Sequence, residues 1–180
     1  MKATSDVLWT SQDAERATNG RTNKEWHADG ISIDTRTIQK GDLFVALKGE
    51  HSDGHRYVAD ALSKGAAVAM VSHVPDNIGS DAPLLIVDDT LKALELLGQA
   101  ARQRCPAKRI GITGSVGKTG TKEMLATAFG ALGQTHASAA SYNNHWGVPL
   151  TLARMHAGTD YGIFEMGMNH PDEIRPLSAQ

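Results

Sequence analysis

The chain has 180 residues, with 18 Lys and Arg against 20 Asp and Glu, and a formal net charge of −2. This balance lacks the positive charge by which general nucleic-acid-binding proteins attract phosphates, so we expect no nucleic-acid partner. The single cysteine, Cys105, excludes a disulfide within the chain and favours a reducing compartment. We expect it to be a small buried side chain.

The apolar runs are too short to form a membrane segment. The longest, residues 66–71 and 43–47, fall far below the ~20 residues that span a bilayer. Residues 1–6 are followed by no apolar stretch of the kind found in signal peptides. We therefore expect a cytoplasmic protein without membrane insertion.

The first part of the chain, residues 1–88, predicts a small mixed α/β domain. Thr10 can cap the first helix, with Asp13 at the fourth position of a capping box. Buried strands are expected where apolar residues run continuously between turn signals. Helices are expected at 11–18 and 55–64, strands at 31–33, 42–47, 67–71 and 84–87, and a polar loop at 19–30.

The second part, residues 89–180, predicts strands that alternate with helices, which implies α/β architecture with mainly parallel pairing. Asp89 and Thr90 can cap a long helix, in which Gly98 costs about 1 kcal/mol relative to Ala. This helix is expected to extend through residue 104. Strands are expected further on at 109–113 and 161–165, and helices at 119–132 and 148–155.

The sharpest motif is Gly114-Ser115-Val116-Gly117-Lys118-Thr119, between a predicted strand and a predicted helix. In such a turn, backbone N–H groups converge on phosphate oxygens, and the positive end of the helix adds to the field. Lys118 would supply charge to the β- and γ-phosphates, and the Thr119 hydroxyl could bind Mg²⁺. Ile112 replaces the first glycine of the longer phosphate loop, so this is a short form of the motif. A plain glycine turn with a surface lysine is the alternative.

Glu165 ends a predicted buried strand, and ligands of open α/β sheets bind at the carboxyl ends of strands. A carboxylate there can hold Mg²⁺ that bridges a transferring phosphoryl group, so Thr119 and Glu165 are the predicted metal ligands. A strand-end surface residue is the alternative. Asn143 and Asn144 either form a turn, since Asn tolerates left-handed backbone, or present their amides to a nucleotide.

The eight histidines show no spacing typical of a zinc site. Three ionisable residues, His51, Asp53 and His55, lie close together in a predicted loop. We expect this cluster to be solvated rather than catalytic.

Several separate motifs follow one another along the chain, and together they are more specific than the glycine loop alone. They are residues 33–36, 41–49 and 53–55 in the first part, and residues 113–119, 122–124, 143–152 and 165–170 in the second.

With these motifs in this order, the chain resembles the Mur ligases of bacterial cell-wall synthesis. The resemblance implies that residues 1–88 are the N-terminal domain that binds the UDP-substrate. Residues 89–180 would be the first part of the family's P-loop-type, parallel-sheet ATP-binding domain. Implied contacts to the uridine nucleotide are Ile33, Thr35, Arg36, Gly49, Glu50, His51 and Ser52; those to ATP are Gly114, Ser115, Val116, Gly117, Lys118, Thr119, Gly120, Asn143 and Asn144.

The resemblance also implies a reaction. In it, ATP phosphorylates the terminal carboxylate of UDP-MurNAc-tripeptide, and the amine of D-Ala-D-Ala attacks the resulting acyl phosphate. Residues 143–152 and 165–167 look like those of the D-Ala-D-Ala-adding members, and Lys118 is the implied catalytic residue. Gly120 departs from the family's usual Ser or Thr. Because the family continues into further domains, we expect an N-terminal fragment that is catalytically incomplete.

Two alternatives stay open at this point. One is a sister Mur ligase that adds the third residue of the peptide. The other is a non-catalytic module that binds ATP or a UDP-sugar.

Overall fold

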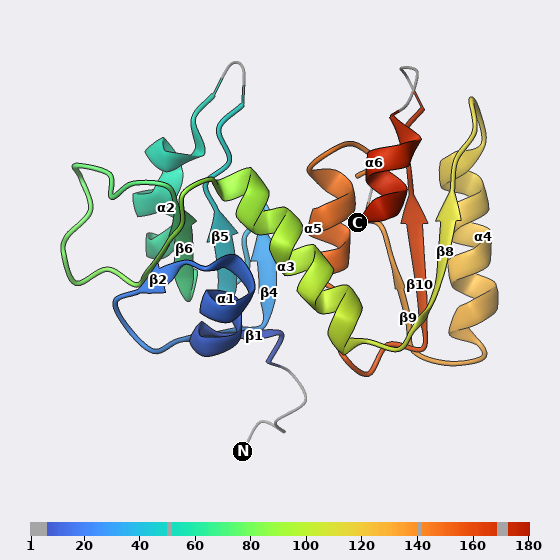
Figure 1. The fold of residues 1–180 in the computed structure, drawn as a ribbon, viewed down its shortest axis with the longest axis horizontal. Helices are drawn as coiled ribbons and strands as arrows, with labels where there is room; N and C mark the ends of the chain where they lie inside the picture. The colour runs from blue at the N-terminus through green and yellow to red at the C-terminus, as the bar shows by residue number, and fades with distance from the viewer. Residues whose placement is uncertain (1–6, 50–51, 140–141, 169–172) are drawn as a thin grey trace. The chain divides into compact units, whose positions relative to one another are not determined.

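A computed structural model describes residues 7–49, 52–139, 142–168 and 173–180. Its contacts divide the chain into two compact units, Met1–Leu96 and Leu97–Gln180, each with its own mainly or wholly parallel sheet (Figure 1). The α/β class expected from the alternating elements is confirmed. Within the part of the chain that is described, no helix has both the length and the apolar character to cross a membrane.

The elements follow in the order that Figure 1 labels. In the first unit they are β1 (Trp9–Thr10), α1 (Ser11–Thr18), β2 (Arg21–Thr22), β3 (His27–Ala28), β4 (Gly30–Ser32), β5 (Asp42–Val45), the 3₁₀ helix η1 (Gly54–Tyr57), α2 (Val58–Ser63), β6 (Val68–Val71) and β7 (Leu84–Ile86). Helix α3 (Thr90–Arg104) contains the division between the units, and β8 (Lys108–Ile112), α4 (Lys118–Gly130), β9 (Thr135–Ala137), α5 (Gly147–Ala153), β10 (Tyr161–Glu165) and α6 (Ile174–Ala179) follow.

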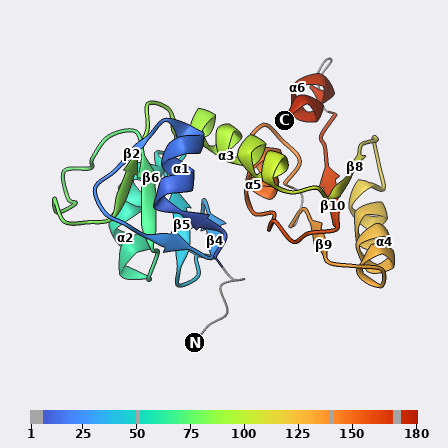
Figure 2. The same ribbon diagram turned by 60° about the horizontal axis from the view of Figure 1, so that its bottom comes forward.

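The first unit is built on a sheet with the strand order β2-β7-β6-β5-β4. The strands from β7 to β4 are parallel, and β2 is an antiparallel edge. A parallel sheet must be covered on both faces. Helix α2 covers one face through Val58 and Ala61, which pack with Phe44, and α1 lies on the other side (Figures 1 and 2).

The prediction of a loop over residues 19–30 is wrong in part, because two short strands lie within it. β3 pairs with β1, with Ala28 opposite Trp9, and β2 pairs with β7, with Arg21 opposite Ile86. A two-residue strand has too few side chains to show a period of two. Pairing with distant strands is therefore what forms β2 and β3.

The capping prediction for α1 is confirmed. Thr10 accepts a hydrogen bond from the Asp13 N–H at 3.2 Å and donates its hydroxyl to the Asp13 carboxylate at 2.9 Å. The helix predicted over 55–64 begins instead with a 3₁₀ turn, because Asp53 accepts the His55 N–H at 2.9 Å and caps that turn.

The sheet of the second unit has the order β8-β10-β9, with both pairings parallel. Successive side chains of β10 point to opposite faces of the sheet. Tyr161 meets Phe129 of α4, with ring centroids 4.7 Å apart, whereas Phe164 packs with Leu152 of α5. Figure 2 shows α4 and α5 on opposite sides of this sheet. Glu165 is four positions after Tyr161 on the same strand, so its side chain points to the same face, the one that α4 covers.

Gly98 lies inside α3, where glycine weakens a helix by about 1 kcal/mol relative to Ala. A Cβ atom at this position would lie 3.0 Å from the carbonyl oxygen of Pro149 and 3.3 Å from the Cβ atom of Leu152. The absence of a side chain therefore lets α3 and α5 approach closely. Cys105, just beyond the end of α3, is buried as expected.

Candidate nucleotide site

The glycine loop connects β8 to α4, as the motif predicts. Gly117 has φ = +78° and Gly114 has φ = +147°, conformations that side-chain-bearing residues rarely adopt. Gly117 is also the N-cap of α4 and offers no side-chain hydrogen bond to the first turn. The first N–H groups of a helix need partners, and a phosphate can supply them.

Lys118 lies over this loop. Its Nζ atom donates a hydrogen bond to the carbonyl oxygen of Gly114 at 2.6 Å. Val116, at the tip of the loop, is 87 % exposed, so the loop opens to solvent. The ammonium group of Lys118 is thus held beside the N–H groups that a phosphate would contact.

Glu165 reaches the loop through the register of the sheet. It lies opposite Ile112 in the parallel pairing of β10 with β8. Its side chain is buried, with 1 % exposure. Oε2 accepts a hydrogen bond from the Thr119 hydroxyl at 3.1 Å, and Oε1 accepts one from the Asn143 amide at 2.9 Å. The backbone N–H of Glu165 donates to the Ser138 hydroxyl at 3.1 Å.

The pair Thr119 and Glu165 fits Mg²⁺ in the chemistry of its donors. Both offer oxygen, and Mg²⁺ takes oxygen ligands, usually one or two carboxylates together with water and substrate phosphates. Among the residues that the structure describes, no group of three His, Cys, Asp or Glu side chains could hold a metal ion. Thr119 and Glu165 would be the protein ligands of such an ion, beside phosphates and water.

The two asparagines have different contacts. Besides its bond to Glu165, Asn143 accepts the Gly167 N–H on its carbonyl oxygen at 2.6 Å, which joins its loop to the end of β10. The side-chain oxygen of Asn144 accepts the Gly147 N–H at 2.9 Å, at the start of α5. Asn143 thus belongs to the group around Glu165, whereas the side chain of Asn144 supports a helix start.

The residues expected to contact a uridine nucleotide lie in the first unit. Arg36 forms a fork with Asp34, with nitrogen–oxygen distances of 2.6 to 3.0 Å. These hydrogen bonds hold the pKa of the Asp34 carboxyl below its usual value. Ile33 is partly buried, and the carbonyl oxygen of Thr35 accepts a hydrogen bond from Lys64 at 3.0 Å.

The other expected uridine contacts lie in the segment before η1. The Gly49 N–H donates to the carbonyl oxygen of Ser52 at 2.9 Å. Glu50 and His51 lie outside the described residues.

The expectation of a solvated cluster at His55 is wrong, because this side chain is only 5 % exposed. Its Nδ1 atom lies 2.6 Å from Asp53 Oδ1, and its Nε2 atom accepts the Ser72 N–H at 2.9 Å. A backbone N–H only donates, so Nε2 is the acceptor and Nδ1 carries the hydrogen. The hydrogen bond from the His55 backbone N–H holds the pKa of Asp53 below its usual value. The cluster anchors η1 to the end of β6.

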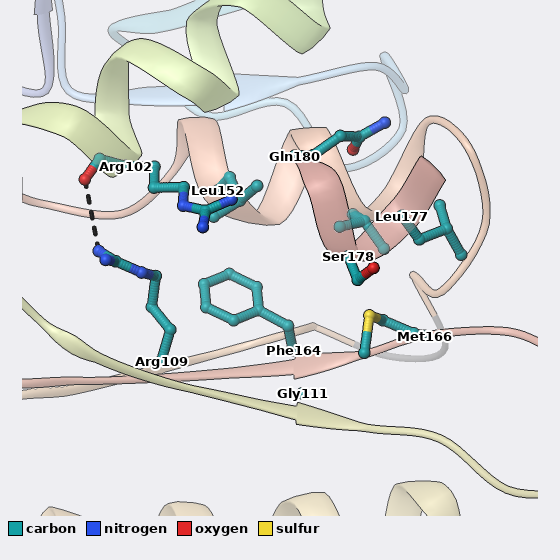
Figure 3. Close-up of a pocket in the computed structure, with 10 residues that line it drawn as sticks. Arg102, Arg109, Gly111, Leu152, Phe164, Met166, Leu177, Ser178 and Gln180 are labelled. Atoms are coloured by element: carbon teal, nitrogen blue, oxygen red, sulfur yellow. Dashed lines mark hydrogen bonds between the residues drawn. The ribbon is translucent and has the colours of Figure 1, made fainter. Parts of the chain in front are cut away.

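A separate pocket of about 220 Å³ lies across the sheet from α4 (Figure 3). Its apolar wall includes Phe164, Met166 and Leu177, and arginines stand at one end. Arg109 donates to the carbonyl oxygens of Arg102 at 3.3 Å and Cys105 at 3.0 Å, so its charge complements the C-terminal end of α3.

Two buried polar residues of the second unit were given no role from the sequence, although residues 122–124 stand in one of its motifs. Lys122 is 1 % exposed and Ser138 is 3 % exposed. Lys122 could have been found, because it follows Lys118 by one helical turn and therefore shares its face. Ser138 carried no such signal, since its role depends on the pairing of β9 with β10.

Two family models match the chain. The model described as "Mur ligase family, catalytic domain" matches residues 27–109, and the one described as "Mur ligase middle domain" matches residues 112–179. Similar curated proteins include the UDP-N-acetylmuramoyl-tripeptide–D-alanyl-D-alanine ligases of Escherichia coli and Bacillus subtilis. The first is 43 % identical over 146 residues, which cover 81 % of this chain and 32 % of the relative. The second is 39 % identical over 149 residues, which cover 83 % of this chain and 33 % of the relative.

Solved structures agree with these matches. MurF from Acinetobacter baumannii superposes with a TM-score of 0.78 at 37 % identity, covering 94 % of this chain and 38 % of that one. MurF ligase from Thermotoga maritima in complex with ADP superposes with a TM-score of 0.62 at 27 % identity. That match covers 83 % of this chain and 34 % of the other. The chain thus spans about a third of the length of the curated relatives it matches. Its motifs, its fold and these likenesses together establish that the chain belongs to the Mur ligase family.

Proposed function

We propose that this chain is the nucleotide-binding part of an ATP-dependent amide ligase, which adds D-Ala-D-Ala to UDP-MurNAc-tripeptide. The observation that carries the proposal is the contact between Thr119 and Glu165 beside the glycine loop. The likeness to ligases named for this reaction, at 39 to 43 % identity, supports the choice of substrates. The ADP complex of the Thermotoga maritima relative supports an adenine nucleotide.

The chemistry explains why such a loop is needed. A carboxylate is a poor electrophile, and transfer of the γ-phosphoryl group of ATP converts it to an acyl phosphate with a good leaving group. The amine then attacks, and phosphate leaves. The chain's task in this reaction is to position the phosphates and to neutralise their charge.

Each residue has a role in that task. Backbone N–H groups of residues 114–117 and the first turn of α4 would cradle the phosphates. Lys118 would exchange its bond to the Gly114 carbonyl for a phosphate oxygen. Mg²⁺, held by Thr119 and Glu165, would supply charge neutralisation on the phosphate oxygens. Asn143 would keep the Glu165 carboxylate oriented.

The first unit would bind the uridine end of the substrate. We place this binding in residues 1–88 and ATP binding in residues 89–180. The proposed contacts are Ile33, Thr35, Arg36, Gly49, Glu50, His51 and Ser52.

The nucleotide part of the proposal is tested on the chain itself. Titration with a fluorescent ATP analogue should give saturable binding that tightens when Mg²⁺ is added. Unlabelled ATP should compete, and Lys118→Ala should weaken the binding. Binding that is indifferent to both Mg²⁺ and Lys118 would contradict the site.

The substrates are tested on the protein at the length of its relatives. Phosphate release from ATP should require both UDP-MurNAc-tripeptide and D-Ala-D-Ala. Release with UDP-MurNAc-dipeptide and a free amino acid would instead identify a ligase that adds the third peptide residue.

A further inference from the structure

The backbone N–H groups at the end of β10 point alternately to its two neighbouring strands. The Met166 N–H, just beyond β10, donates to the carbonyl oxygen of Ile112 on β8 at 2.8 Å. The N–H before it, that of Glu165, therefore points to the side of β9. However, β9 ends at Ala137, which lies opposite Ile163, two residues before Glu165. The acceptor for the Glu165 N–H must therefore come from beyond the end of β9.

Ser138, the first residue after β9, supplies this acceptor with its side chain. Its hydroxyl oxygen accepts the Glu165 N–H at 3.1 Å, and its own N–H donates to the carbonyl oxygen of Ile163 at 3.0 Å. The side chains of Ser138 and Glu165 are buried, with 3 % and 1 % exposure, so water cannot replace a lost contact cheaply. Ser138 thus fixes the backbone of β10 at residues 163 and 165.

The carboxylate of Glu165 is held at both of its oxygens as well. The Thr119 hydroxyl contacts one at 3.1 Å, and the Asn143 amide contacts the other at 2.9 Å. These two contacts hold the end of the side chain, whereas Ser138 holds the backbone from which the side chain extends. A ligand must be held to within about 0.5 Å to work, so both ends of Glu165 have to be fixed.

We propose that Ser138 is a positioning residue of the nucleotide site. Its hydroxyl holds the backbone of Glu165 so that the carboxylate faces the Thr119 hydroxyl. This inference rests on the proposed function, because it takes Glu165 to be a ligand of Mg²⁺. Residues that hold a metal ligand in place typically change the metal affinity about 10- to 100-fold when they are replaced. Ser138 acts through Glu165 alone, so its loss should appear in the effect of Mg²⁺ and not in nucleotide binding without it.

The test is a titration of the chain with a fluorescent ATP analogue at a series of Mg²⁺ concentrations. Ser138→Ala removes the acceptor, so the Mg²⁺ concentration that gives half of the gain in affinity should rise on the order of tenfold. Affinity without Mg²⁺ should match the wild type, because the glycine loop is unchanged. Ser138→Thr keeps a hydroxyl and should keep most of the Mg²⁺ effect.

Thr151→Val is the control for the loss of a buried hydroxyl elsewhere in the same unit. Thr151 is 2 % exposed, and its hydroxyl donates to the carbonyl oxygen of Gly147 at 2.9 Å. It belongs to α5, on the opposite side of the sheet from α4 (Figure 2). Thermal denaturation without nucleotide should show a lower melting temperature in both Thr151→Val and Ser138→Ala. Only Ser138→Ala should also weaken the Mg²⁺ effect.

A full Mg²⁺ effect in Ser138→Ala would overturn the inference, and so would an equal loss in Thr151→Val. If Ser138→Ala does not fold, Ser138→Cys takes its place, because a thiol is only a weak acceptor and the same loss is expected. Failure of both Ser138 variants to fold would make the residue a structural one and would also overturn the inference. A wild-type chain whose nucleotide binding ignores Mg²⁺ would instead overturn the proposed function itself.

Discussion

The Thr119 hydroxyl, in the first turn of α4, donates to Glu165 Oε2 at the end of β10 across 3.1 Å. These residues lie 46 positions apart, and the parallel register of β10 with β8 brings them together. Asn143 holds the second carboxylate oxygen at 2.9 Å. A hydroxyl and a carboxylate are therefore fixed beside the glycine loop before any ligand arrives.

This relationship predicts how Mg²⁺ affects nucleotide binding. Glu165→Gln keeps the shape of the side chain but removes its charge, so the gain in affinity from Mg²⁺ should largely vanish. Binding without Mg²⁺ should hold or improve, because a negative charge near the phosphates is gone. Thr119→Ala should also reduce the Mg²⁺ effect, whereas Thr127→Ala, on an exposed part of α4, should not. A full Mg²⁺ effect in Glu165→Gln would exclude Glu165 as a ligand.

Lys118→Ala should weaken ATP binding on the order of tenfold or more, because it removes a charge-assisted contact to phosphate. The melting temperature should change little, since the lost bond joins a partly buried ammonium to the Gly114 carbonyl. The matched control is Lys92→Ala, which removes an exposed lysine paired with Glu95. If Lys118→Ala bound ATP as tightly as the control, Lys118 would have no role at the phosphates.

Gly98→Val should lower the free energy of unfolding by about 1–3 kcal/mol, because the new side chain meets Pro149 and Leu152. Gly120→Val is the matched control, since a Cβ atom there meets nothing within 4 Å. Its unfolding free energy should stay within about 0.5 kcal/mol of the wild type or rise. Urea denaturation of both variants provides the comparison. Equal stability of the two would contradict the close packing of α3 on α5.

His136 should make the chain less stable in mild acid. Burial lowers the pKa of this histidine, although its hydrogen bond to the Thr151 carbonyl at 2.8 Å acts in the opposite direction. In the unfolded chain this histidine has its ordinary pKa of about 6.5 and binds a proton there, whereas in the folded chain it stays neutral to lower pH. The neutral, buried imidazole therefore contributes its full stability to the folded chain above about pH 6.5. That stability is lost as the pH falls from there through the lowered pKa.

The measurement is the melting temperature between pH 7.5 and pH 5, of the wild type and of His136→Gln. The melting temperature of the glutamine variant should fall less on acidification than that of the wild type, because the variant has no buried imidazole to protonate. His27→Gln, at an exposed position, should behave like the wild type. Parallel curves for all three proteins would show that His136 does not contribute.

Local chemistry made much of the fold predictable. The capping of α1 by Thr10, the glycine turn before α4 and the alternation of strands with helices all depend on residues close together in the chain. The two-residue strands β2 and β3 were missed for the opposite reason. Each exists because its backbone pairs with a distant strand, which leaves no periodic pattern in its own residues.

The candidate site divides in the same way. The sequence by itself determined the phosphate loop with Lys118 and Thr119, because a glycine turn before a helix is a local arrangement. Only the tertiary structure decided that Glu165 is buried against Thr119 and Asn143, since strand register brings them together. It also decided the burial of His55 and Lys122, because the energy of a buried polar group depends on partners that folding supplies.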